Sequence, residues 1–318
     1  MKTIVILDGK TMGNVNFNLL NEFGEVRYYD NTLPESVEER VKDANVILTN
    51  KVVLNENNLA GSENLELICE MATGYNNIDT EYAKEKGIGV ANVAGYSTTS
   101  VAQHTFATLL HIYDEIAYYD NYVKSGEYSK SHTFTNLDRE FRDISGKVWG
   151  IIGLGAIGKR VARIAEAFGA EVQYYSTSGT NNSSEYKNVS FDELLKTSDI
   201  ISIHAPLNEK TSGLINYDAI SRMKRNAVLI NMGRGPIVVE ADLAKALNEH
   251  LIKAAALDVF QTEPIKEDNP LLSISNKEKL VMTPHIAWAS LESRERLVNE
   301  IIKNISAFYK GEKRNRIV

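Results

Sequence analysis

Residues 147–170 read KVWGIIGLGAIGKRVARIAEAFGA, an apolar strand followed by three spaced glycines and a helical pattern. A GxGxxG spacing between a strand and a helix predicts a dinucleotide-binding turn. Gly153 would allow a tight turn, Gly155 would let the backbone approach a pyrophosphate, and Gly158 would let the helix pack closely on its strand. The N-terminus of the helix would offer free N–H groups to the anion. A glycine-rich turn without a ligand is the alternative interpretation.

Short apolar runs alternate with helical patterns along the rest of the sequence. The runs include KTIVIL, VILTN, LELICEMA, EVQYYS, IISIHA, AVLIN, AAALDV and KLVMTPH, and a further helical pattern is EADLAKALNEH. Runs rich in Val and Ile are typical of parallel strands that are buried on both faces. Their alternation with helices predicts an α/β protein with doubly wound parallel sheets.

The position of the glycine turn in mid-sequence implies that a complete unit precedes it. Residues 1–98 hold four or five candidate strands, and residues 147–285 hold six. A final helix, residues 291–309, has no sheet left to join in the second unit, so it would return to the first. We therefore expect a discontinuous domain of residues 1–98 plus 290–318, and a second domain of residues 99–289.

The segment of about residues 120–145 is polar, contains aromatic residues and has no clear period. It is either a surface loop or an arm that packs on a partner subunit. The sequence on its own leaves both interpretations open.

The composition excludes several classes of function. The protein has 318 residues, and 35 Lys and Arg against 42 Asp and Glu give a net charge of −7, which argues against a nucleic-acid surface. No apolar run reaches the ~18 residues of a membrane span, and the N-terminus begins a strand rather than a signal peptide. Cys69 is the only cysteine, and the six histidines are scattered. We therefore expect no metal site and a reducing cytoplasm.

Three charged residues follow strands at the edge where open α/β sheets bind ligands. Arg234 follows AVLIN, Glu263 lies beyond AAALDV, and His285 ends KLVMTPH. Histidine suits the protonation of a carbonyl oxygen near neutral pH, and a neighbouring carboxylate would orient it and favour its charged form. Arginine can hold a carboxylate through two parallel hydrogen bonds. The three residues together predict hydride transfer to a 2-keto acid, although each alone fits an ordinary structural role.

Six motifs occur in the order ATGYNNID, GLGAIG, HAPLNEKT, INMGRG, LDVFQTEP and TPHIAWAS. Through nearly the whole sequence they resemble the D-isomer-specific 2-hydroxyacid dehydrogenases. The forms ATGYNNID, NVAGYSTTSVAQHT and HIAWAS look most similar to the glycerate dehydrogenase, or hydroxypyruvate reductase, subgroup. The resemblance implies a flavodoxin-like substrate domain, a Rossmann cofactor domain and a homodimer with residues 120–145 as a dimer arm.

The resemblance also implies roles for site residues. His285 would donate the proton, Glu263 would pair with it, and Arg234 would bind the substrate carboxylate and carbonyl. Thr73 and Gly74 would offer backbone N–H groups to the same carboxylate. The cofactor-binding residues would be Thr105, Gly153, Gly155, Ala156, Ile157, Gly158, Ser176, Thr177, Ser178, His204, Pro206, Thr211, Asn231, Met232, Gly233, Asp258, His285 and Ala287.

Within this set, Asp258 would hold the nicotinamide carboxamide, Thr105 would lie near the phosphates, and His204 and Pro206 would line the cofactor site. The remaining histidines are weaker candidates for the active site. His104 and His111 lie seven residues apart on one helical pattern, which suggests packing, and two others are expected at the surface, His132 and His250.

Residues 174–182, YYSTSGTNN, bear on which dinucleotide binds. Ser176 stands 176 − 158 = 18 positions after Gly158, where NAD-preferring relatives carry an acidic residue for the ribose. The loop instead offers uncharged groups, from Ser176, Thr177, Ser178, Asn181 and Asn182. Thr177 stands where many NADP-preferring relatives have arginine. We expect NAD(H) or NADP(H) as the cofactor, with a slight preference for NADP(H). The alternative is a polar loop that admits the 2′-phosphate without requiring it.

These patterns predict a cytoplasmic, dimeric NAD(P)H-dependent oxidoreductase that interconverts a small 2-keto acid and its D-2-hydroxy acid. Hydroxypyruvate with D-glycerate, or glyoxylate with glycolate, is the first choice. One alternative is a dehydrogenase of D-lactate or of branched D-2-hydroxy acids. Another is a non-catalytic corepressor that senses a dinucleotide.

Overall fold

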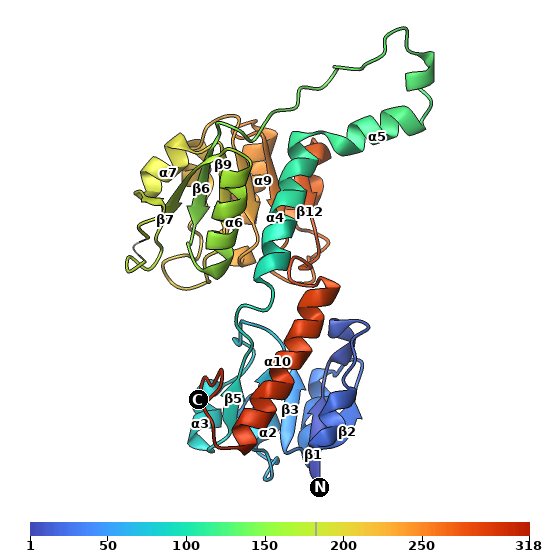
Figure 1. Ribbon diagram of the computed structural model, residues 1–318, viewed down its shortest axis with the longest axis vertical. Coiled ribbons are helices and arrows are strands. Elements are labelled where there is room, and N and C mark those ends of the chain that lie inside the picture. The colour runs from blue at the N-terminus through green and yellow to red at the C-terminus, as the bar shows by residue number, and fades with distance from the viewer. Residues whose placement is uncertain (182) are drawn as a thin grey trace. The chain divides into compact units, whose positions relative to one another are not determined.

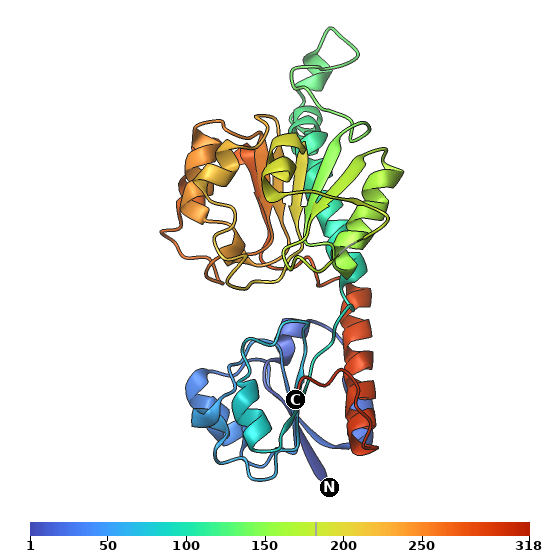
Figure 2. The same cartoon turned by 90° about the vertical axis from the view of Figure 1, so that its left-hand side faces the viewer.

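The computed structural model describes residues 1–181 and 183–318. Asn182, one of the expected polar groups of the cofactor loop, therefore lies outside the described residues. The protein consists of two compact units, Met1–Ser97 with Ala289–Val318 and Thr98–Trp288. Figures 1 and 2 show the ribbon of each unit from two directions.

The first unit is built on a five-stranded parallel sheet. Its order is β2-β1-β3-β4-β5, with bounds Gly24–Tyr28, Lys2–Ile6, Val46–Thr49, Leu67–Glu70 and Gly89–Ala91. This order is that of flavodoxin-like sheets, in which the strand order reverses between the first and third strands. Helices of this unit are α1 (Val37–Val41), α2 (Glu56–Leu59), α3 (Thr80–Glu85) and α10 (Leu291–Tyr309). The last of these, α10, packs against β4 of the first unit. Figure 1 shows α10 beside the sheet of this unit.

The second unit is built on a seven-stranded parallel sheet of order β12-β11-β10-β9-β6-β7-β8. The bounds in that order are Leu280–Met282, Ala254–Leu257, Val228–Asn231, Ile200–Ile203, Val148–Ile152, Glu171–Tyr175 and Lys187–Asn188. Beginning with β6, the order is the doubly wound arrangement of dinucleotide-binding sheets with one further strand at an edge. The strand order reverses between β6 and β9, and ligands bind at such a switch point. The expectation of two doubly wound parallel sheets is confirmed.

Side chains of the central strands alternate between two separate cores in the second unit. In β10, Val228 and Ile230 belong to the core that contains residues of α4 (Thr98–Tyr113) and α6 (Ala156–Ala167). Leu229 belongs to the opposite core, with residues of α7 (Phe191–Thr197), α8 (Tyr217–Ser221) and α9 (Glu240–Asn248). Burial on both faces explains why these strands are continuously apolar in sequence.

Residues 99–119, TSVAQHTFATLLHIYDEIAYY, have a helical pattern in the sequence, but the structure interrupts this helix. Helix α4 ends at Tyr113, and α5 begins at Ile116 and ends at Lys124. Glu115 between them adopts a left-handed backbone with φ of 51°, and its carboxylate pairs with Arg139 at 3.0 Å. The break lets α5 leave the body of its unit, as Figures 1 and 2 both show.

A second difference from the sequence patterns is β8, a two-residue edge strand absent from the six predicted in this unit. Both of its residues are polar and exposed, so no apolar run in the sequence predicts this strand. Short 3-10 helices complete the structure, at Gly9–Met12, Asn18–Glu22, Pro34–Ser36, Tyr128–Lys130, Gly235–Ile237, Pro270–Ser273 and Lys277–Lys279.

Candidate active site

The glycine turn follows β6 at the switch point of the second sheet. Gly153 has a φ of +92°, a left-handed conformation that favours glycine. A Cβ on Gly158 would lie 2.4 Å from the Gly153 carbonyl oxygen, so only glycine allows the helix to approach so closely. Gly155 is the N-cap of α6, and nothing occupies the space beside it within 4 Å. The turn therefore leaves the N-terminus of a 12-residue helix open to an anion.

The loop after β7 lies against this turn through one side chain. The Asn181 side-chain amide donates to the Leu154 carbonyl at 2.6 Å, and the Asn181 backbone N–H donates to the Ser176 hydroxyl at 3.3 Å. Ser176 is buried, and Ser178 shares a hydrogen bond with Thr180 at 2.9 Å. The Asn181 amide thus holds the loop in place, and the residues left to meet a ribose or phosphate carry no charge.

His285 and Glu263 form a direct pair. Nδ1 of His285 lies 2.7 Å from Oε2 of Glu263, and Oε1 of Glu263 accepts a hydrogen bond from the backbone N–H of Phe260 at 3.0 Å. With Nδ1–H donating to the carboxylate, Nε2 is the nitrogen that can exchange a proton with a substrate. The two side chains are 23% and 33% exposed, so a small molecule can reach them. His285 has a φ of +55°, which the neighbouring residues must hold in place.

Asp258 supplies that constraint. Asp258 is buried, and its carboxylate accepts hydrogen bonds from the backbone N–H groups of Ile286 at 2.9 Å and Ala287 at 2.8 Å. The Thr283 hydroxyl donates to the same carboxylate at 2.6 Å. The backbone N–H of His285 donates to the Asp258 carbonyl at 2.8 Å. Asp258 therefore fixes the turn that carries His285, a role that the sequence did not suggest.

His104 also contacts this turn, although its spacing on α4 had suggested packing only. Its Nε2 lies 3.0 Å from the Thr283 hydroxyl and 3.7 Å from Oδ1 of Asp258. The contact joins residues 179 positions apart, so no local sequence pattern could reveal it.

Arg234 lies in the turn after β10, at the same edge of the sheet. Asn231 shapes this turn, because its side-chain amide donates to the Arg234 carbonyl and accepts from Gly233 N–H, both at 3.0 Å. The guanidinium donates to the Gly233 carbonyl at 2.9 Å. Among the residues that the structure describes, no carboxylate forms an ion pair with Arg234. Its charge is therefore available for an anionic substrate.

His204 follows β9, beside the switch point. Nε2 lies 3.1 Å from the Ser202 hydroxyl, which accepts a hydrogen bond from the Trp149 indole at 2.8 Å. Burial lowers the pKa of His204 to about 3, so the ring is neutral near pH 7. Within residues 1–181 and 183–318 its Nδ1 has no hydrogen-bond partner. The next turn is closed by the buried Thr211 hydroxyl, which donates to the Pro206 carbonyl at 2.7 Å.

For the remaining candidate residues the structure gives only contacts within their own unit. The Thr105 hydroxyl is fully buried and donates to the Val101 carbonyl at 2.8 Å, so within its unit it serves α4 itself. Thr73, with Gly74, belongs to the first unit, where its hydroxyl donates to the Val93 carbonyl at 2.9 Å. The roles implied for these three residues stay predictions.

Over residues 1–181 and 183–318, no helix combines the length and apolar character needed to span a bilayer. The same residues bring no three His, Cys, Asp or Glu side chains together as metal ligands would require.

A glycine turn for a dinucleotide and an acid–base pair at the same sheet edge are the parts of a nicotinamide-dependent oxidoreductase. Comparison with known proteins gives the family. Residues 106–287 match the model described as D-isomer specific 2-hydroxyacid dehydrogenase, NAD binding domain. The chain belongs to this family of oxidoreductases, which confirms the prediction from its six motifs.

Individual relatives agree with this assignment. The chain is 40% identical to the hydroxypyruvate reductase of Blautia hydrogenotrophica, over 97% of both proteins. It is 34% identical to the glycerate dehydrogenase of Methylorubrum extorquens, over 99% of its own length and 98% of the relative. Among solved structures, it resembles an acyclic imino acid reductase in complex with NADPH and D-Arg, with a TM-score of 0.88 and 30% identity over 99% and 100% of the two proteins. The protein is thus an enzyme that interconverts 2-keto and 2-hydroxy acids with a nicotinamide dinucleotide.

Proposed function

We propose that the protein is a cytoplasmic NAD(P)H-dependent reductase of small 2-keto acids, with hydroxypyruvate and glyoxylate as its substrates. The observation that carries this proposal is the accessible His285–Glu263 pair, at the same sheet edge as an arginine without a carboxylate partner among the described residues. The names of the relatives from Blautia and Methylorubrum support the choice of hydroxypyruvate and D-glycerate.

Each residue has a defined task in this reaction. When bound at the glycine turn, the reduced dinucleotide supplies a hydride for the carbonyl carbon. Arg234 holds the substrate carboxylate, and backbone N–H groups of Thr73 and Gly74 are proposed to bind the same group. His285 gives the proton at Nε2 to the carbonyl oxygen, so that the carbonyl group becomes a hydroxyl group once the hydride has reached its carbon. Glu263 keeps the ring oriented and stabilises its charged form.

Cofactor preference is proposed to lean to NADPH, because no acidic side chain occupies residues 174–181. An aspartate at the position of Ser176 would accept hydrogen bonds from the ribose and repel a 2′-phosphate. The exposed hydroxyl of Ser178 and its neighbours can donate to that phosphate instead.

A kinetic comparison tests substrate and cofactor together. We expect kcat/KM to be largest for hydroxypyruvate or glyoxylate, smaller for pyruvate and branched 2-keto acids, and larger with NADPH than with NADH.

Ser176→Asp is expected to lower kcat/KM for NADPH by about tenfold or more, because it places a charge against the phosphate. A matched Ser275→Asp variant, at an exposed serine outside the cofactor loop and outside residues 120–145, is expected to leave kcat/KM for NADPH and for NADH unchanged.

Four outcomes would contradict parts of this proposal. A kcat/KM strongly in favour of NADH would remove the lean to NADPH. If activity were highest with branched 2-keto acids, these acids and not hydroxypyruvate or glyoxylate would be the substrates. Reduction of keto acids only in the presence of an amine would favour imine reduction, the activity in the name of the solved relative. Binding of NAD(P)H without turnover of any substrate would favour a sensing role.

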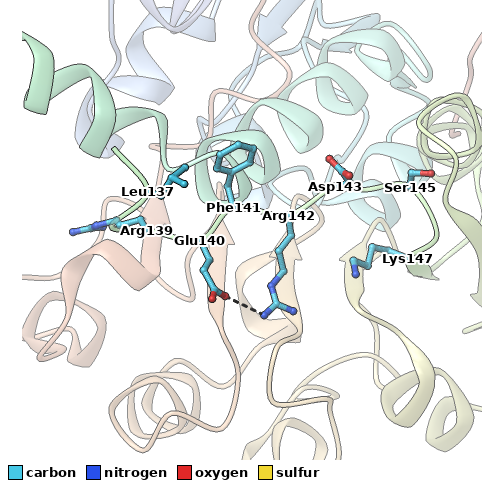
Figure 3. A pocket seen from close by; sticks show the side chains of 8 residues that line it. All are labelled: Leu137, Arg139, Glu140, Phe141, Arg142, Asp143, Ser145 and Lys147. Atoms are coloured by element: carbon cyan, nitrogen blue, oxygen red, sulfur yellow. Dashed lines mark ion pairs between the residues drawn. The ribbon is translucent and has the colours of Figure 1, made fainter. Parts of the chain in front are cut away.

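We further propose that the protein is a homodimer and that residues 120–145 contact the partner. No residue of α5 is buried, and three apolar side chains beyond it are 91%, 74% and 55% exposed: Phe134, Leu137 and Phe141. Leu137 and Phe141 line a hollow of about 630 Å³, together with charged residues such as the Glu140–Arg142 pair at 3.7 Å (Figure 3). Apolar side chains exposed to this extent are typical of an interaction surface.

Sedimentation measurements test the dimer. The expected mass is twice the 35.5 kDa of one protomer. Phe134→Asp is expected to weaken the dimer, because it would bury a charge in the interface. Leu19→Asp, at a 49% exposed site in the first unit, is the matched control. A monomeric wild-type protein, or equal dissociation of both variants, would remove this assignment of the segment.

A further inference from the structure

Helix α9 begins with Glu240, a residue that is 6% exposed and whose two carboxylate oxygens both accept hydrogen bonds. Oε1 accepts a hydrogen bond from the backbone N–H of Gln261 at 2.7 Å, and Oε2 accepts one from the Asn269 side-chain amide at 2.7 Å. These two donors lie on either side of Glu263. One buried carboxylate therefore ties together both ends of the loop that carries half of the acid–base pair.

This loop depends on contacts from outside for its conformation. It connects the end of β11 at Leu257 with the 3-10 helix that begins at Pro270, and between them the backbone has no regular secondary structure. A loop without internal helix or strand hydrogen bonds needs partners elsewhere to hold one conformation. Glu240 provides two such partners, from a helix that contains neither member of the acid–base pair.

A second contact fixes the loop at the same place. A Cβ on Gly235 would lie 1.9 Å from the carbonyl carbon of Phe260 and 2.5 Å from the backbone nitrogen of Gln261. The backbone of these two residues therefore packs directly on the turn that carries Arg234. Gly235 and Glu240 both belong to the segment after β10, so this segment holds the Phe260–Gln261 peptide by packing and by hydrogen bonding.

From this peptide the connection continues to the reacting group. The backbone N–H of Phe260 donates to Oε1 of Glu263 at 3.0 Å, and Oε2 of the same carboxylate meets Nδ1 of His285 at 2.7 Å. A shift of the Phe260–Gln261 peptide would move the donor that orients Glu263, and Glu263 would then lose its alignment with the imidazole.

We propose that Glu240 is a positioning residue for the catalytic reaction, acting through Glu263 to keep the His285 imidazole aligned. The inference rests on the proposed roles of Glu263 and His285. It deepens that proposal by assigning the origin of the alignment to a buried carboxylate on another element, which touches neither substrate nor cofactor.

The first test is Glu240→Gln, compared with Glu249→Gln at the exposed end of the same helix. Glutamine keeps the size of the side chain but directs an amide N–H₂ group at one of the two donors, so one buried donor loses its acceptor. We expect kcat for keto-acid reduction to fall by about 10- to 100-fold, since small misplacements of reacting groups cost that much. The Kd for NAD(P)H, measured by fluorescence, is expected to stay unchanged. Glu249→Gln is expected to keep the wild-type rate.

The split between kcat and KM gives a readout that general loss of structure would not produce. In Glu263→Gln the imidazole loses the carboxylate that orients it, so kcat should fall while KM for hydroxypyruvate stays near its wild-type value. Glu240→Gln is expected to show the same split. Glu240→Asp, which keeps the charge but is one methylene shorter, provides a second variant if the glutamine variant does not fold.

The double variant Glu240→Gln/Glu263→Gln separates the possible outcomes. If Glu240 acts through Glu263, the double variant has the kcat and KM of Glu263→Gln alone. Losses that multiply, or an equal loss of NAD(P)H binding, would overturn the inference. Full activity of Glu263→Gln would remove the proposed role of Glu263 and the inference with it. Loss in Glu263→Gln but not in either Glu240 variant would remove the inference alone.

Discussion

Replacement of His285 with alanine is expected to lower kcat for hydroxypyruvate reduction by about 10²–10⁴-fold, the usual contribution of a general acid. The reason is local. Nδ1 is engaged with Glu263 at 2.7 Å, so Nε2 is the position from which a proton reaches the carbonyl oxygen. Alanine removes the proton donor, and because its methyl group is smaller than the imidazole, water can fill the space that the ring occupied. Stopped-flow measurement of NAD(P)H oxidation under single-turnover conditions reports this step directly.

The control for this variant must keep the cofactor site intact. His111→Ala, an exposed histidine on α4, is expected to retain the wild-type rate. The Kd of the His285 variant for NAD(P)H should remain within about twofold of wild type, since loss of the acid changes the chemical step rather than uniform binding. A fall in kcat of less than about tenfold would mean that another group, or water, protonates the product.

Sequence patterns were sufficient for the parts of the fold and site that depend on short segments. The glycine turn was predictable because Gly153, Gly155 and Gly158 lie in six consecutive residues between a strand and a helix. The placement of Arg234 and His285 at one edge of the sheet was predictable because each lies just beyond an apolar strand, and the ends of parallel strands share one edge. Their roles in the reaction stay predictions. The two parallel sheets followed from the same strands.

Contacts between distant segments were not predictable in this way. Glu240 opens a helix whose sequence pattern gives no hint of the loop at residues 261–269, and its role emerges only when both are packed together. The contact of His104 with Thr283 joins α4 to the end of β12. The break at Glu115 has a similar cause, since the carboxylate of this residue meets Arg139 from a later part of the sequence. Local periodicity carries no information about such partners.

The second large effect is expected for Arg234→Lys, which keeps the positive charge but removes the planar pair of donors. A guanidinium can bind a carboxylate through two parallel hydrogen bonds, whereas an ammonium is a point charge without that geometry. We expect kcat/KM for hydroxypyruvate to fall by about 10²-fold or more, since damage to one partner of a close charge pair costs roughly 2–5 kcal/mol. Steady-state kinetics at saturating NAD(P)H measure the change. Arg225→Lys, at an exposed site, should show none.

A substrate without a carboxylate tests whether Arg234 acts by binding the carboxylate of the keto acid. Glycolaldehyde has the reacting carbonyl and the neighbouring hydroxyl of a small substrate, but no anion for the guanidinium to hold. If Arg234 serves mainly to bind the carboxylate, wild type and Arg234→Lys should reduce glycolaldehyde at similar, low kcat/KM. The loss would then be specific to hydroxypyruvate and glyoxylate. An equal loss with glycolaldehyde would instead mean that Arg234 acts on the carbonyl or on the turn at Gly233, where its guanidinium already donates to the backbone. Because the described residues provide no carboxylate partner for Arg234, we expect the substrate to be the anion that completes this site.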